Sequence, residues 1–147
     1  MTDGVIDLYL LRECLQDPAM GFGRVYDFVI SPHGERREAG RISVRMGESP
    51  CVYYFGHIGY HVDPPYRGHR YAARACRLVK RLYETAGKHS VVITCDPDNL
   101  PSSRTCEALG CVLERTVDVP DRIRGRWEIS PVKRRYIWRL DGETPGM

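Results

Sequence analysis

Long apolar runs, paired-cysteine motifs and a strong excess of either charge are all missing from this chain of 147 residues. A helix that crosses a bilayer needs about 20 consecutive apolar residues, and no run approaches that length. The first residues carry Asp3 and Asp7 and no basic segment, which is not the pattern of an export signal. We therefore expect a cytoplasmic protein with no membrane partner.

The six cysteines form no C-x-x-C pair. The closest two, Cys106 and Cys111, have no histidine at the spacing that zinc ligands require. We therefore expect no metal site, and we expect the cysteines to be free thiols that pack as small apolar residues.

The overall composition is that of a globular domain. Hydrophobic residues make up 42% of the chain and charged residues 28%, which excludes a disordered or fibrous protein. The formal net charge is only +3, so nucleic acid is the least favoured partner, although arginines cluster locally after residues 67 and 122. The length predicts a single domain over residues 1–141 and a loose tail over residues 142–147.

The pattern of apolar residues predicts an α/β fold. Four strands are expected first, over residues 5–11, 24–31, 37–46 and 51–62. An amphipathic helix follows and ends at Gly87, and a second helix begins after Asn99 and ends at Gly110. Strands are expected over residues 91–93, 111–119 and 132–140. The strand–helix–strand unit in the middle favours a mixed, mostly antiparallel twisted sheet of six or seven strands flanked by helices.

The stretch from His57 to Ala72 carries the clearest chemical signal. A strand ends near Val62, prolines mark a loop, and a helix begins at a glycine, Gly68. The first N–H groups of such a helix form a natural site for phosphate or pyrophosphate. Arg67, His69 and Arg70 add donors and positive charge. Taken alone, the same pattern would also fit an ordinary basic helix start.

The run Arg67–Ala72 resembles the acetyl-CoA-binding motif of the GNAT superfamily of N-acetyltransferases. A second stretch resembles the helix that flanks the pantetheine arm in the same family, with Asn99, Ser102, Glu107 and Gly110 at matching spacing. The combination is most similar to the branch of ribosomal-protein N-terminal acetyltransferases. The resemblance implies acetyl-CoA as cosubstrate, and these are the residues expected to bind it: Val62, Arg67, Gly68, His69, Arg70, Tyr71, Ala72, Asn99 and Ser102.

The chain departs from the family pattern at three positions. Arg70 stands where the family has its second glycine, Cys106 where a tyrosine often serves as general acid, and Thr94 where some members have a glutamate base. The resemblance therefore supports cofactor binding better than it supports one particular acid–base pair.

Four residues are candidates for acid and base: His57, Tyr60, His61 and Cys106. The ordinary pKa of histidine, near 6.5, suits a general base. Family members that carry their base on this strand place it on the same face as Ile58. His57 and His61 lie on the opposite face of a regular strand and would point away. Tyr60 has the favoured parity and is expected to be an acid or a substrate contact. Three alternatives stay open: a structural His57, an inert Cys106 thiol, and proton removal by water.

The leading hypothesis is an N-acetyltransferase that moves an acetyl group directly to a primary amine, either a small molecule or a peptide or protein N-terminus. The alternative is a GNAT-fold module that binds acyl-CoA without turnover. Family members place two helices after the first strand, where this chain has only the short segment Arg12–Gly23. We therefore expect a shortened helical region there, and an acceptor groove that is either open or completed by the second subunit of a homodimer.

Overall fold

The computed structural model describes residues 1–14, 21–124 and 129–140. The expected tail over residues 142–147 and most of the segment between the first two strands lie outside these residues. The described residues form seven strands: β1 (Ile6–Cys14), β2 (Val25–Pro32), β3 (Gly40–Arg45), β4 (Ile58–Val62), β5 (Ser90–Cys95), β6 (Val112–Asp118) and β7 (Val132–Arg139). The helices are α1 (Pro50–Phe55), α2 (Tyr71–Thr85), α3 (Leu100–Ala108) and α4 (Asp121–Arg124), with a short 3-10 turn, η1 (Pro64–Tyr66).

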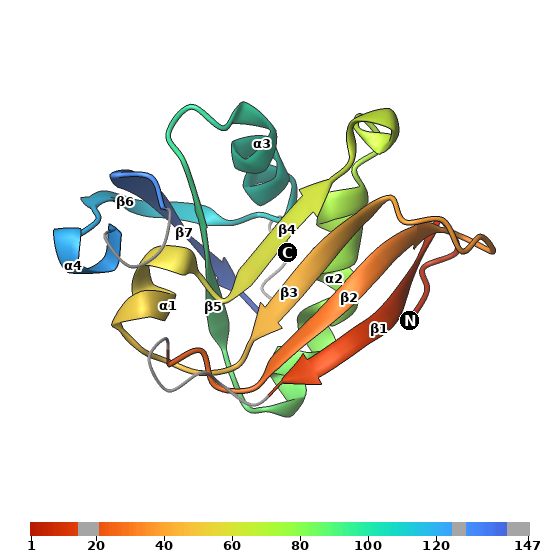
Figure 1. The fold of residues 1–147 in the computed structure, drawn as a ribbon, viewed down its shortest axis with the longest axis horizontal. Coiled ribbons are helices and arrows are strands. Elements are labelled where there is room, and N and C mark those ends of the chain that lie inside the picture. The colour runs from red at the N-terminus through yellow and green to blue at the C-terminus, as the bar shows by residue number, and fades with distance from the viewer. Residues whose placement is uncertain (15–20, 125–128, 141–147) are drawn as a thin grey trace, which may run out of the picture.

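The strands form two antiparallel sheets, one in the order β1-β2-β3-β4 and the other in the order β5-β7-β6 (Figure 1). The predicted α/β fold with seven strands is confirmed. The single mixed sheet predicted from the sequence would require a parallel ladder between β4 and β5. In the described residues no such ladder joins the two sheets. The two sheets are linked where the N–H of His57, just before β4, donates to the carbonyl of Val92 in the middle of β5 at 2.8 Å.

One predicted strand is wrong in its first half. Residues 50–55 form α1 rather than the start of the strand expected over residues 51–62. The Ser49 side chain accepts a hydrogen bond from the Val52 N–H at 3.1 Å, and Pro50 occupies the first turn. Gly56, with φ +81°, ends the helix. These capping signals outweigh the β-propensity of the enclosed valine and tyrosines.

Helix α2 covers one face of the four-stranded sheet (Figure 1). Its buried face carries Ala75, Cys76, Val79 and Tyr83, at the helical spacing that the sequence predicted. These side chains pack on the buried isoleucines, leucine, valine and phenylalanine of β1–β4 in the main hydrophobic core. Gly87, with φ +83°, follows the helix.

Among the described residues, no helix is long and apolar enough to cross a membrane. No cluster of three or more histidine, cysteine or acidic side chains in the same part of the chain could hold a metal ion. All six cysteines are free thiols, four of them buried.

His57 joins the two sheets at the point where they meet. Its Nδ1 accepts a hydrogen bond from the Val92 N–H at 2.9 Å, so the ring is neutral and its Nε2–H donates to Glu48 at 2.7 Å. Burial lowers the pKa of His57, against the opposing effect of Glu48. The Tyr83 hydroxyl donates to the carbonyl of His57 at 2.8 Å. His57 therefore links β4, β5 and α2.

We expect His57→Ala to lower the free energy of unfolding by about 2–3 kcal/mol at pH 7.5, because it leaves a cavity and an unpaired buried N–H. The loss should be smaller at pH 5.5. The unfolded chain takes up a proton at His57 below pH 6.5 while the folded chain resists it, so the contribution of the wild-type histidine falls as the pH drops.

Urea denaturation at the two pH values measures both effects. His69→Ala, at an exposed histidine, is the matched control and should change stability by less than about 0.5 kcal/mol. An equal loss at pH 7.5 and pH 5.5 for His57→Ala would contradict the neutral, buried state of this ring.

Candidate functional site

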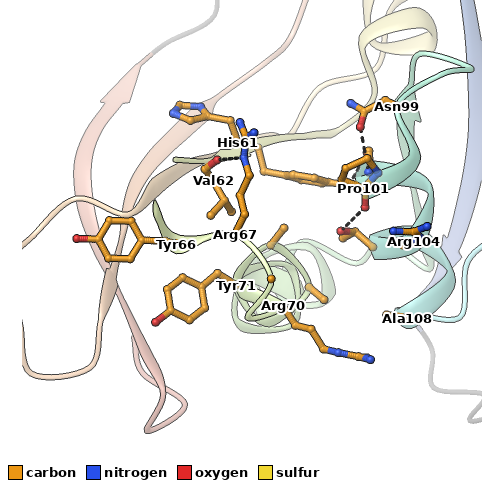
Figure 2. A pocket seen from close by; sticks show the side chains of 16 residues that line it. His61, Val62, Tyr66, Arg67, Arg70, Tyr71, Asn99, Pro101, Arg104 and Ala108 are labelled. Atoms are coloured by element: carbon orange, nitrogen blue, oxygen red, sulfur yellow. Dashed lines mark hydrogen bonds between the residues drawn. The ribbon is translucent and has the colours of Figure 1, made fainter. Parts of the chain in front are cut away.

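Beyond the His57 contact the two sheets separate, and a cavity of about 720 Å³ opens between β4, the loop before α2, and α3 (Figure 2). Its walls come from segments that are far apart in the sequence. The cavity is lined by Tyr60, His61, Val62, Tyr66, Arg67, Gly68, Arg70, Tyr71, Ala72, Ala73, Asn99, Pro101, Ser102, Arg104, Thr105 and Ala108.

The start of α2 forms one wall. Gly68 has φ +90°, and Arg70 occupies the left-handed conformation with φ +61° and ψ +28°. Tyr71 and Ala72, the first residues of α2 after this turn, line the cavity, and their N–H groups have no partner within the helix. Arg67 is held by its own contact, since its Nε donates to the carbonyl of Val62 at 2.9 Å (Figure 2). The wall therefore combines main-chain donors, a helix dipole and two guanidinium groups.

The main chain of β4 forms the second wall. The Arg45 N–H donates to the carbonyl of His57 at 2.8 Å, which places His57 in a hydrogen-bonded position of the antiparallel β3–β4 ladder. Because such ladders alternate, the main-chain groups of Tyr60 and Val62 point away from β3. Both residues line the cavity, so β4 offers their N–H groups and the Tyr60 carbonyl along this wall, while the Val62 carbonyl accepts from Arg67.

Helix α3 forms the third wall. The Asn99 side chain caps it by accepting a hydrogen bond from the Ser102 N–H at 3.1 Å. The Ser102 hydroxyl lies 2.8 Å from the hydroxyl of Tyr60, which spans the space between β4 and α3. Burial raises the pKa of Tyr60 well above its ordinary value, so its hydroxyl stays protonated at neutral pH.

Two of the four acid–base candidates lie outside the cavity lining. His57 is engaged in joining the sheets, as described above. Cys106 is fully buried in the main core, where the neighbouring Cys111 and burial raise the pKa of its thiol. His61 lines the cavity with a side chain that is 59% exposed, and its Nε2 lies 3.7 Å from the carboxylate of Asp63.

Eight of the nine residues expected to bind the cofactor line the cavity. The exception is His69, which is exposed and whose ring lies 5.8 Å from the ring of Tyr71.

Sequence reasoning missed part of the α3 wall. The cavity is also lined by Pro101, Arg104, Thr105 and Ala108. These residues recur at helical spacing and so share one face of α3, and Arg104 brings a further positive charge (Figure 2). Helical spacing from Ser102 could have identified Thr105, three residues later, whereas the other three depend on how α3 packs.

Comparison with known proteins agrees with this geometry. The family profile of the acetyltransferase (GNAT) domain matches residues 9–112, a range that includes every residue lining the large cavity. No curated protein sequence matches the chain.

Solved structures share the fold. Ribosomal-protein-S5-alanine acetyltransferase from Vibrio fischeri is 23% identical, with a TM-score of 0.61 over 82% of this chain and 64% of that one. RimL, a ribosomal L7/L12 alpha-N-protein acetyltransferase, is 19% identical, with a TM-score of 0.59 over 81% of this chain and 72% of RimL. The microcin C7 self-immunity acetyltransferase MccE, solved with acetyl-CoA and AMP, is 20% identical, with a TM-score of 0.59 over 78% and 61%. This chain thus spans less than two thirds of the first of these proteins.

The turn at Arg70 yields a stability prediction. A left-handed conformation disfavours an arginine and suits glycine, so Arg70→Gly should raise the free energy of unfolding by about 0.5–1 kcal/mol. Arg81→Gly, an exposed position inside the same helix, should instead lower it by about 1 kcal/mol. Urea denaturation of both variants measures the difference, and a loss of stability in Arg70→Gly would contradict the strained turn.

Proposed function

The chain belongs to the GNAT acetyltransferase family, and we propose that it transfers an acetyl group from acetyl-CoA directly to a primary amine. The observation that carries the proposal is the cavity itself. It brings together the start of α2, the capped start of α3 and the edge strand β4. The cytoplasmic location and the homodimer stay predictions from the sequence.

The three walls suit the three parts of acetyl-CoA. The start of α2, with Gly68 and Arg70, offers N–H groups and charge to the pyrophosphate. The β4 main chain and the Asn99–Ser102 segment offer paired donors and acceptors to the amide groups of the pantetheine arm. In this arrangement the thioester lies beside Tyr60, which reaches from β4 to α3.

Acetyl transfer forms a C–N bond, breaks the C–S bond and releases a proton from the amine. The thioester oxygen gains negative charge as the amine attacks, and we assign the main-chain N–H of Val62 as its donor. The protonated Tyr60 hydroxyl donates a hydrogen bond to the sulfur as it leaves. His61, at the exposed end of the cavity, accepts the proton of the amine and passes it to water.

The binding-module alternative is favoured by one observation. The positions where the family often has a tyrosine acid and a glutamate base carry Cys106 and Thr94, and Cys106 is buried away from the cavity. Tyr60 is the residue that distinguishes the two functions, since a module without turnover has no need of its hydroxyl.

An assay of free-thiol release distinguishes an acetyltransferase from a module that binds acyl-CoA without turnover. The protein is incubated with acetyl-CoA and a panel of small amines, polyamines and peptides. We expect amine-dependent thiol release above the hydrolysis rate, slowed about tenfold or more in Tyr60→Phe with an unchanged KM for acetyl-CoA. Saturable acetyl-CoA binding with no amine-dependent release would instead support the module.

Gly68 provides a test of cofactor placement. It has φ +90°, and no atom lies within 4 Å of the position that a Cβ would take, so a β-branched residue there distorts the turn without a steric clash. We expect Gly68→Val to weaken acetyl-CoA binding about tenfold or more, measured by calorimetry. Gly34→Val is the matched control, because Gly34 also has a positive φ (+77°) and open surroundings, in the turn after β2. Equal weakening in both variants would mean that the pyrophosphate does not bind at the start of α2.

A further inference from the structure

We propose that the uncovered face of the four-stranded sheet binds the acceptor, and that it selects an amine that also carries a carboxylate, held by Arg12 and Arg41. The proposal rests on the proposed acetyl transfer for the role of the amine. The binding of the carboxylate is argued from the groove alone.

The face opposite α2 has no helix over it among residues 1–14, 21–124 and 129–140 (Figure 1). Apart from Tyr9 and Val29, most of the side chains of its inner strands are polar, where the core face presents isoleucine and valine. Asp27, Ser43 and Gly59 form one cross-strand row, and Arg41 lies opposite His61 in the next. On β1, Arg12 is brought opposite Asp27 by a bulge after Leu10.

A groove of about 290 Å³ follows this face. Its lining is mostly polar and consists of Leu11, Arg12, Asp27, Arg41, Ser43, Arg45, Gly59, Tyr60 and His61. Three arginines thus face one carboxylate in the groove, which gives it a positive balance of charge.

The groove continues toward the cofactor cavity. It shares Arg45, Gly59 and Tyr60 with a second cavity of about 310 Å³ between the two sheets. That second cavity shares Tyr60, Asn99 and Ser102 with the large cavity. Tyr60 lines the groove and both cavities. An amine at the inner end of the groove therefore lies near Tyr60, and the proposed position of the thioester is beside the same residue.

Arg45 is the fixed charge at the inner end. Its Nη1 donates to the carbonyls of Phe55 and Gly56, at 3.1 and 3.0 Å, and its guanidinium lies 4.8 Å from the ring centroid of Phe22. A side chain at Gly59 would place its Cβ 2.8 Å from the Arg45 Nη2, so glycine leaves room for this guanidinium. Arg45 is therefore committed to the protein itself.

Arg12 and Arg41 are in a different state, because both are largely exposed at the rim. Their side chains are 66% and 47% exposed, and each has a single acidic partner among the described residues. Arg12 pairs with Asp27 at 2.7 Å, and Arg41 with Glu38 at 3.0 Å. Exposed ion pairs contribute little to the free energy of folding. Both guanidinium groups can therefore donate some of their N–H hydrogen bonds to a ligand carboxylate with little loss of stability.

This arrangement sets the chemical class of the acceptor. A carboxylate at the rim and an amine at the inner end match a free amino acid, or a peptide N-terminus with an acidic residue close to it. Both sources share the same chemistry. Polyamines and other purely cationic amines are repelled by the arginines.

Titrations followed by amide chemical shifts, with the protein saturated with CoA, test the proposal independently of turnover. The probes are two matched pairs: glycine against glycinamide, and the amidated peptide Gly-Glu against Gly-Gln. In one pair or both, we expect the carboxylate member to bind about tenfold more tightly, with a preference that weakens as salt is added. The pair that shows the preference identifies the free amino acid or the acidic peptide as the ligand.

Arg12→Gln and Arg41→Gln should each reduce the preference about threefold or more, and the double variant should remove it. Arg115→Gln, at an exposed arginine of β6, is the control and should leave it unchanged. Equal binding of both members of each pair, or a preference that survives in the double variant, would overturn the proposal. Carboxylate-selective binding without amine-dependent thiol release would support this groove while counting against the proposed enzyme.

Discussion

The divergence of β4 from β5 is the constraint on which the rest of the structure depends. The strands are held together at His57 and Val92, through two hydrogen bonds, and no ladder between β4 and β5 continues beyond them. A β-strand edge that is left unpaired inside a protein normally costs free energy, because its N–H and carbonyl groups lose their partners. Here that cost is compensated if the groups bind a ligand. The same divergence creates the large cavity and leaves Tyr60 between the two sheets.

The divergence also separates two electrostatic environments. On one side, the start of α2 and the arginines around it favour phosphate groups. On the other, the face of the four-stranded sheet that no described helix covers carries arginines of its own around Asp27, whose carboxylate lines the groove. Both sides are positive, and they meet at a phenol that burial keeps protonated. Under the proposed function, a neutral amine would approach the thioester between these two positive regions.

Much of the fold was predictable because its signals are local. Helix α2 follows from the periodicity of its alanines and valine, and the start of α3 from Asn99 and the proline after it. The segment Arg67–Ala72 could likewise be placed at a cavity wall, since a motif of this kind is a continuous turn. Arg70 shows that the turn survives a non-ideal residue, because the arginine adopts the left-handed conformation that glycine would adopt. The strand predicted over residues 51–62 is wrong in its first half because β-propensity suggested a strand where the Ser49–Pro50 cap starts a helix.

By itself, the sequence determined the family, the α/β architecture and the segments from which the large cavity is built, because each is encoded in short, continuous patterns. Only the tertiary structure decided which side chains reach that cavity. His57 and His61 share one strand parity in the sequence, yet one is buried against Val92 and Glu48 and the other is open to solvent. The arginines of β1 and β3 meet on one face through strand pairing and a β-bulge. Burial and cross-strand neighbours come from residues distant along the chain, so no local pattern could supply them.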